Sequence, residues 1–131
     1  MKAPDISKKK QSSLKDLPDS FRNAFSGIIV LIKSEYNAGF HLVVLVMVVI
    51  AGIVLKISTA HWIAIVLVSG LVIASECFNT AIEYLSDAVT PEANLMIGKA
   101  KDVAAAGVLV SAITAAITGL IIFIPAIVRL F

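Results

Sequence analysis

Charged residues are scarce in this chain, and cysteine is nearly absent. Asp, Glu, Lys and Arg make up only 15% of the 131 residues, and Cys77 is the single cysteine. One cysteine excludes an internal disulfide, so we expect Cys77 to serve as a small buried side chain. The formal net charge is only +2, which gives no electrostatic support for nucleic-acid binding.

The sequence also lacks the two common phosphate-binding loops. Neither Gly-x-x-x-x-Gly-Lys-Ser/Thr nor Gly-x-Gly-x-x-Gly occurs. A nucleotide would therefore need Mg²⁺ held by carboxylates, together with lysine, to neutralise its phosphates. A Ser–His–Asp set or a Cys–His metal site is not indicated, because His41 and His61 are predicted to lie on opposite sides of a membrane.

Hydrophobic residues, by contrast, reach 59% of the chain, which is typical of a small integral membrane protein. We predict an all-α membrane protein whose single domain covers residues 18–131. Transmembrane helices are expected at about 40–57, 62–80 and 103–125. The second of these helices should run on to about Ala88, and the third should open near Lys99 and end before Pro125.

The N-terminal part has a different character. Residues 1–17 are polar and rich in lysine, which predicts a disordered basic arm. A helix is then expected to start at Pro18, with Asp19 or Ser20 as its cap. Apolar residues recur at helical spacing at Phe21, Phe25, Ile28, Ile29 and Ile32. This pattern predicts an amphipathic helix on the membrane surface.

A short extra span is the competing interpretation of this helix. Only ten uncharged residues separate Arg22 from Lys33, whereas a transmembrane helix needs about 20. Seven of the eleven basic residues precede Phe40, and Lys99 and Lys101 lie between the second and third spans. The positive-inside rule then places the N-terminus and the second loop in the cytoplasm.

One stretch carries a ladder of polar residues into apolar sequence. Its members recur at i, i+3, i+4, i+7 and i+11, on one face of a helix: Glu76, Asn79, Thr80, Glu83 and Asp87. The fourteen residues from Trp62 to Ser75 carry no charge and cover about 21 Å, less than the roughly 30 Å of a hydrocarbon core. We therefore expect Glu76 to lie inside the membrane or at its far edge.

Carboxylates at that depth are costly and usually functional. The plainer interpretation is that Glu76 pairs with a lysine or an amide only to orient helices, and that Glu83 and Asp87 are solvated. Alternatively, two carboxylates two turns apart, with an amide between them, can act at different depths. One can accept a proton, and the other can bind a metal ion.

The motifs resemble a known family over about residues 20–125. They are Glu76-x-x-Asn79-Thr80-Ala81-Ile82-Glu83-x-x-x-Asp87, Ala100-Lys101-Asp102-x-Ala104-Ala105, Phe21-Arg22-x-Ala24-Phe25-x-Gly27 and Glu35-x-Asn37-x-x-x-His41. Together they resemble the bacterial integral-membrane diacylglycerol kinase and undecaprenol kinase family. The resemblance implies a homotrimer of three-span chains in the bacterial cytoplasmic (inner) membrane, with active sites shared between subunits. It also implies transfer of the γ-phosphoryl group of MgATP to a lipid alcohol.

The resemblance also implies roles for single residues. Glu76 is expected to be the catalytic base, and Glu35 and Glu83 the Mg²⁺ ligands. Contacts with ATP are expected from Asn23, Glu35, Glu83, Glu92, Asn94, Lys101 and Asp102. The lipid site is expected to involve Asn37, His41, Trp62, Glu76 and Asn79.

Two other functions compete with a lipid kinase. The chain could be a proton- or ion-conducting membrane protein with Glu76 as relay, or a scaffold subunit without catalysis. A relay needs ionisable groups along the membrane depth, and the first and third spans offer none at mid-depth. For the kinase, Asn79-Thr80-Ala81 and Glu35-x-Asn37…His41 resemble the undecaprenol-type branch of the family more closely, which implies undecaprenol rather than diacylglycerol as the acceptor.

Overall fold

The structure, a computed structural model of the whole chain, describes residues 17–34, 36–89 and 94–130, and the side chains of residues 34 and 36–38 are outside that description. Residues 1–16 of the predicted basic arm therefore lie outside the described residues. The same holds for two of the predicted site residues, Glu35 and Glu92.

The described residues form four α-helices and no strand, which confirms the all-α prediction. The helices are α1 (Leu17–Ser34), α2 (Tyr36–Val54), α3 (Thr59–Val89) and α4 (Leu95–Val128). Two of them, α3 and α4, are long and apolar enough to cross a membrane, whereas the apolar stretch Gly39–Val54 of α2 is shorter.

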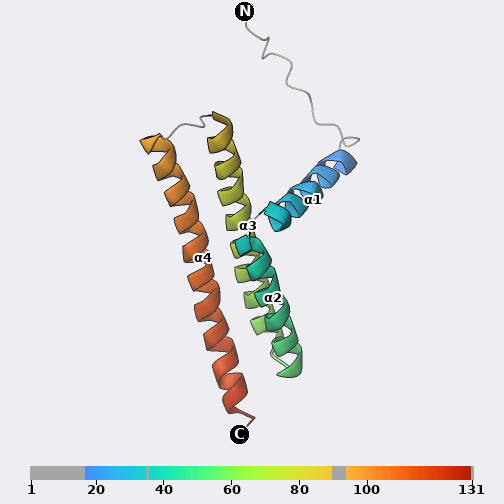
Figure 1. The fold of residues 1–131 in the computed structure, drawn as a ribbon. Coiled ribbons are helices and arrows are strands. Elements are labelled where there is room, and N and C mark those ends of the chain that lie inside the picture. Colours follow the sequence, from blue (N-terminus) through green and yellow to red (C-terminus); the bar gives the residue numbers. More distant parts are fainter. Residues whose placement is uncertain (1–16, 35, 90–93, 131) are drawn as a thin grey trace, which may run out of the picture.

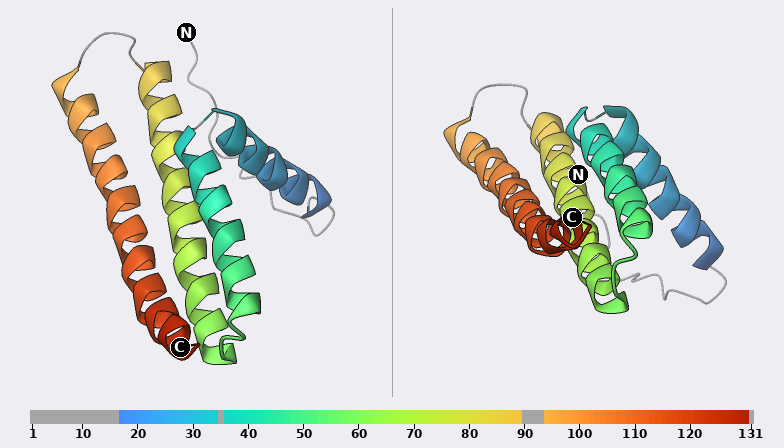
Figure 2. Two further views of the ribbon diagram at one scale, coloured as in Figure 1. Left: turned by 60° about the horizontal axis from the view of Figure 1, so that its bottom comes forward. Right: turned by 90° about the horizontal axis from the view of Figure 1, so that it is seen from below.

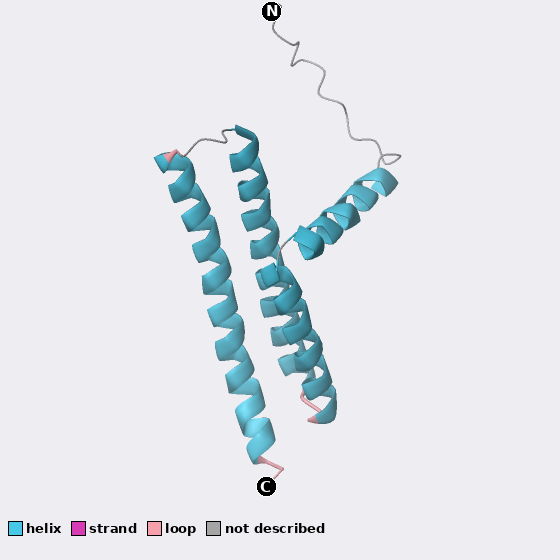
Figure 3. Cartoon of the chain, viewed as in Figure 1, coloured by secondary structure: helices cyan, strands magenta, loops and turns pink. Residues whose placement is uncertain are grey.

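Helices α3 and α4 run side by side in opposite directions and form the main contact of the fold (Figures 1 and 2). Helix α2 packs on the first half of α3, and α1 extends away from the other three helices at a steep angle (Figure 3). The end of α1 nearest the bundle meets α2 and α3 close to the middle of α3.

Very little apolar surface is buried within one chain. Among the described residues, the buried apolar side chains are Leu31, Ile65, Val72 and Ile122. Large side chains such as Leu67 stay exposed along the whole length of the helices. Continuous apolar surface of this extent must be covered by lipid or by protein, since water solvates it poorly.

The first helix begins earlier than expected. It starts at Leu17, so Pro18 occupies the first turn, where its missing N–H costs no hydrogen bond. Asp19 and Ser20 consequently lie inside the helix, so the prediction that one of them is the cap was wrong. Asp19 instead faces Arg22 at 3.4 Å.

The bounds of the two long helices differ from the expected ones for local reasons. Helix α3 ends at Val89, one residue beyond the predicted end. Helix α4 begins at Leu95 rather than near Lys99, because the Oδ1 atom of Asn94 accepts hydrogen bonds from the N–H groups of Met96 at 2.9 Å and Ile97 at 3.3 Å.

The expectation that this helix stops before Pro125 was wrong. Helix α4 continues through Pro125 to Val128, and the N–H of Arg129 donates to the Pro125 carbonyl at 3.3 Å. Proline removes one hydrogen bond from the ladder but already has a helical φ. In apolar surroundings no water competes for the remaining backbone groups, so the helix persists.

The turn between α2 and α3 depends on a close approach at Gly52. The N–H of Ile57 donates to the Gly52 carbonyl and that of Lys56 to the Ile53 carbonyl, both at 3.2 Å, with Lys56 at a φ of 49°. These two bonds form a Schellman cap. The Trp62 ring lies against Gly52 so closely that a Cβ there would fall 2.8 Å from its Cη2 atom.

We predict that Gly52→Ala lowers the melting temperature of the purified protein. The added methyl would collide with the Trp62 ring and force it to move, at a cost of about 1–3 kcal/mol. Thermal melting in detergent measures the change. Gly98→Ala is the matched control, because a Cβ at Gly98 has no neighbour within 4 Å. Equal melting temperatures for the two variants would contradict this account of the turn.

Candidate functional site

The site is organised around Glu76, which is buried in the middle of α3. Its side chain is 3% exposed, and it shares one face of the helix with the equally buried Val72 and Thr80. A cavity of about 100 Å³ adjoins it, between the end of α1 and the helices α2 and α3. This cavity is lined by Ile28, Leu31, Ile32, His41, Leu42, Ile73 and Glu76.

His41 of α2 contacts the carboxylate of Glu76. Its Nε2 atom lies 3.2 Å from Glu76 Oε1, and its side chain is 22% exposed. The distance is that of an ion pair, while the geometry is not that of a well-aligned hydrogen bond. The neighbouring Phe40 ring meets the imidazole edge to face, with centroids 5.8 Å apart. Two helices thus bring a base and a carboxylate together within apolar surroundings.

The polar ladder continues along α3 toward Val89. One turn after Glu76, Asn79 donates from its Nδ2 atom to Glu83 Oε1 at 3.3 Å. Its Oδ1 atom and the Thr80 Oγ1 atom are buried and have no hydrogen-bond partner among the described residues. The ladder thus contains two buried oxygen atoms whose hydrogen-bonding capacity no described residue satisfies.

Thr80 differs in this respect from several other hydroxyl residues of α3 and α4. Four of them donate to the carbonyl one turn earlier, at 2.6–2.9 Å: Ser86, Ser111, Thr114 and Thr118. Because Ser111 has a single hydroxyl proton, it also accepts from Ser75 across the α3–α4 interface, at 2.7 Å.

The outer end of the ladder is joined to α4. Lys101 Nζ lies 3.3 Å from Asp87 Oδ1. The Asp87 side chain is 72% exposed, so the pair adds little to stability, about 0–1 kcal/mol for a surface pair. The pair matters for position, because it places Lys101 next to Asp87, one helical turn beyond Glu83.

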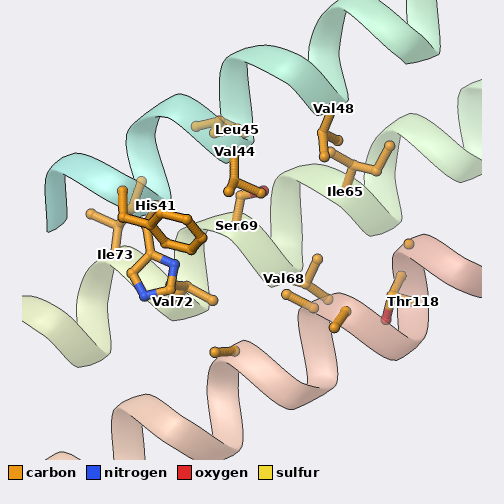
Figure 4. Close-up of a pocket in the computed structure, with 15 residues that line it drawn as sticks. His41, Val44, Leu45, Val48, Ile65, Val68, Ser69, Val72, Ile73 and Thr118 are labelled. Atoms are coloured by element: carbon orange, nitrogen blue, oxygen red, sulfur yellow. The ribbon is translucent and has the colours of Figure 1, made fainter. Parts of the chain in front are cut away.

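A larger apolar cavity of about 370 Å³ opens between α2, α3 and α4 (Figure 4). His41 stands at one end of it, and Val48, Ile65 and Thr118 lie toward the other. It is lined by Phe40, His41, Val44, Leu45, Val48, Ile65, Val68, Ser69, Val72, Ile73, Ala112, Ala115, Ala116, Thr118 and Gly119. His41 therefore borders both cavities, whereas Glu76 borders only the smaller one.

The structure brings together part of the predicted site. His41, Glu76, Asn79 and Glu83 gather along one face of α3, with Lys101 near its outer end. Two residues of the set were not assigned a role from the sequence: Thr80 and Asp87. Their positions at i+4 and i+11 from Glu76 were the available signal.

Other predicted residues lie elsewhere. Trp62 contacts Gly52, about 21 Å along α3 from Glu76. Asn23 is exposed on the half of α1 that points away from the bundle. The Asn94 Oδ1 atom is occupied by the helix cap, and Asp102 is exposed on α4. Asn37 lies in the first turn of α2, and its side chain is outside the described set.

The fold and the site describe a small helical membrane enzyme with buried and exposed carboxylates on one helix face. The family model of the prokaryotic diacylglycerol kinases matches residues 22–123, and the chain belongs to this family. It is therefore a lipid kinase, and the family gives no support to an ion-conducting function.

Two relatives show how far the similarity extends. The chain is 35% identical over 119 residues to the undecaprenol kinase of Bacillus subtilis, covering 91% of this chain and 97% of that protein. It is 32% identical over 112 residues to a diacylglycerol kinase of Synechocystis, covering 85% of this chain and 64% of that protein. No solved structure matches the chain significantly.

The two buried hydroxyls of Thr80 and Ser111, each 5% exposed, should respond in opposite ways to removal. We expect Thr80→Val to keep or raise the melting temperature, because an unpartnered buried hydroxyl is replaced by a methyl group of similar shape. Ser111→Ala should lower stability by about 0.5–1.5 kcal/mol, because it breaks the interhelical bond to Ser75.

Thermal melting in detergent without nucleotide or lipid measures both variants. Thr114→Val is the control, since its hydroxyl bonds only within its own helix, to the Val110 carbonyl. A loss for Thr80→Val as large as that for Ser111→Ala would show that the Thr80 hydroxyl already has a partner.

Proposed function

We propose that this protein transfers the γ-phosphoryl group of ATP to the hydroxyl of undecaprenol, with Glu76 as the catalytic base and Mg²⁺ as the cofactor. The observation that carries the proposal is the depth of Glu76. It is a buried carboxylate in an apolar helix, on the face that carries Glu83 two turns further out. A lipid hydroxyl resides near the membrane interface, and ATP resides in water, so the two reactants meet along such a ladder.

The chemistry follows from these positions. The acceptor hydroxyl attacks the γ-phosphorus, a new P–O bond forms, and the bond to the bridging oxygen of ADP breaks. The proton of the attacking hydroxyl passes to the Glu76 carboxylate. Because phosphoryl transfer requires little covalent help, the protein contributes mainly the alignment of the two substrates and charge compensation.

The oxygen atoms near Glu83 suit Mg²⁺. The Glu83 carboxylate and the Asn79 Oδ1 atom are hard donors, and Mg²⁺ in kinases is commonly held by one or two carboxylates plus phosphate oxygens. Among the described residues no group of three or more His, Cys, Asp or Glu side chains forms a metal site. The second protein ligand is proposed to be Glu35, by the family resemblance.

When bound, Mg²⁺ supplies neutralisation of the phosphate charge. The rest of the nucleotide site is proposed from charge and position. Lys101, held beside Asp87, lies about one turn beyond Glu83 and is placed to contact a phosphate. By the family resemblance, further contacts to the nucleotide come from Asn23, Glu92, Asn94 and Asp102.

We also propose that α2, α3 and α4 each span the bacterial cytoplasmic membrane and that three chains assemble into a homotrimer. The exposed apolar surface of the three helices supports this arrangement, since lipid and neighbouring chains would cover it. Helix α1 would lie on the cytoplasmic surface, with the N-terminus and the loop of residues 90–94 on the same side. The distribution of the basic residues supports this orientation.

The acceptor is proposed to be undecaprenol for two reasons. The similarity to the Bacillus subtilis undecaprenol kinase covers nearly the whole of both chains. In addition, the larger cavity next to His41 has apolar walls except for His41, Ser69 and Thr118. A polyprenol carries no polar group behind its hydroxyl, whereas the two ester groups of diacylglycerol would be buried there without enough donors.

Competition between the two lipids should show this preference. With purified protein, MgATP and equal amounts of undecaprenol and diacylglycerol in mixed micelles, we expect mainly the polyprenyl phosphate. When the γ-phosphate of ATP carries the label, separation of the two labelled lipid phosphates measures the ratio of the products. Mainly phosphatidic acid would refute the proposed acceptor but not the kinase activity, whereas no labelled lipid of either kind would refute the proposed reaction itself.

Two variants should distinguish the proposed role of Glu76 as the base from that of Glu83 as a metal ligand. Glu76→Gln keeps the size of the side chain but removes the base. It should lower kcat by roughly 10² or more while leaving MgATP affinity nearly unchanged. Glu83→Gln should weaken nucleotide binding in a way that excess Mg²⁺ partly restores.

Steady-state kinetics and titration with MgATP separate the two effects. Asp19→Asn is the control, because Asp19 is an exposed carboxylate whose ion pair is with Arg22 on the same helix, α1. Equal losses of MgATP affinity in the Glu76 and Glu83 variants would show that the roles are not divided by depth.

A further inference from the structure

We infer that His41 is a positioning residue, which holds the Glu76 carboxylate in the orientation that receives the acceptor proton. The inference rests on the proposed function, in which Glu76 is the base, and adds a role to a residue expected only to line the lipid site. The observation that carries it is the 3.2 Å contact between His41 Nε2 and Glu76 Oε1.

The contact joins two different helices. His41 belongs to the second turn of α2 and Glu76 to the middle of α3, so the pair fixes how these helices meet at the depth of the reaction. A glutamate side chain turns about three bonds, and burial alone does not select one orientation of its carboxylate. A partner on another helix, such as His41, does select one orientation of the carboxylate.

The imidazole is itself held in place. The Phe40 ring meets it edge to face at 5.8 Å, with an angle of 67° between the planes. Its side chain borders the larger apolar cavity on one side and, on the other, the small cavity that Glu76 lines. His41 therefore stands where the space for a hydrocarbon chain meets the base, and it is only 22% exposed.

A carboxylate that is 97% buried needs polar partners, because desolvation of its charge costs several kcal/mol. The His41 Nε2 atom lies 3.2 Å from Oε1, at ion-pair distance though not aligned as a hydrogen bond, and a proton on it offsets part of that cost. Either charge state of the imidazole can supply it, since Nε2 carries a proton in one neutral tautomer and in the cation. The positional role thus depends on an N–H at Nε2 rather than on a full positive charge.

The chemistry suggests a discriminating pair of substitutions. In His41→Gln the side-chain amide nitrogen can reach about the same place as Nε2 and carries N–H groups that can face the carboxylate. In His41→Phe the ring fills the same space and keeps the cavity wall but has no donor. A residue that only lines the lipid site would tolerate phenylalanine at least as well as glutamine.

The test compares these variants in the full chain, in the wild-type background and in the Glu76→Gln background. We expect His41→Phe to lower kcat by roughly 10- to 100-fold, as small misplacements of catalytic groups do, with the KM for undecaprenol nearly unchanged. His41→Gln should recover most of the lost rate. With the base already removed, His41→Phe should cost little more, because both substitutions then disable the same step.

Three results would overturn the inference: a raised lipid KM with kcat retained in His41→Phe, no recovery in His41→Gln, or a full additional loss in the double variant. Each would leave the proposed kinase reaction intact. Absence of lipid-dependent ATP turnover in the wild-type protein would overturn both. If His41→Phe does not fold, His41→Asn replaces it, because its shorter amide cannot reach Glu76.

A double-mutant cycle in thermal melting reports the contact without any turnover. The effects of His41→Phe and Glu76→Gln on the melting temperature should be non-additive, since each removes one side of the same pair. Additive effects would show that the two side chains do not interact in the folded protein and would refute the positioning role.

Discussion

The central constraint on this molecule is the presence of a carboxylate in the interior of an apolar helix bundle. A charged group in such surroundings is expensive, and the cost is tolerated only where partners from other elements are supplied. Here Leu31 at the end of α1 lines the same small cavity as Glu76, and α2 brings His41 to its carboxylate. The ends of α1 and α2 thus both meet α3 at the level of this one side chain.

The position of Glu76 along α3 also lies between two different surroundings. One direction along α3 leads through Asn79 and Glu83 toward Asp87 and Lys101, where the residues become exposed. The other direction leads along the large cavity, where the walls are nearly all apolar. In the proposed reaction ATP approaches from the first direction and the lipid from the second, past His41, which borders both cavities.

Much of this architecture could be predicted from residue periodicity. The four helices and the shared face of Glu76, Asn79 and Glu83 follow from apolar length and from the 3.6-residue repeat. The contact of His41 with Glu76 could not be derived in this way, because it depends on how far α2 slides along α3. Two local details were also not predicted. Asn94 caps α4, which therefore begins at Leu95, and the helix continues through Pro125.

A single chain buries very few of its own apolar side chains, and this affects the source of its stability. Only four apolar side chains are buried among the described residues, so most of the free energy of folding must come from contacts with molecules outside the chain. Folding is then linked by mass action to whatever covers those helices. The unfolding temperature of such a protein is a property of the mixture, and it shifts with the ratio of protein to lipid. The fraction of folded chains then depends on membrane composition as well as on the sequence.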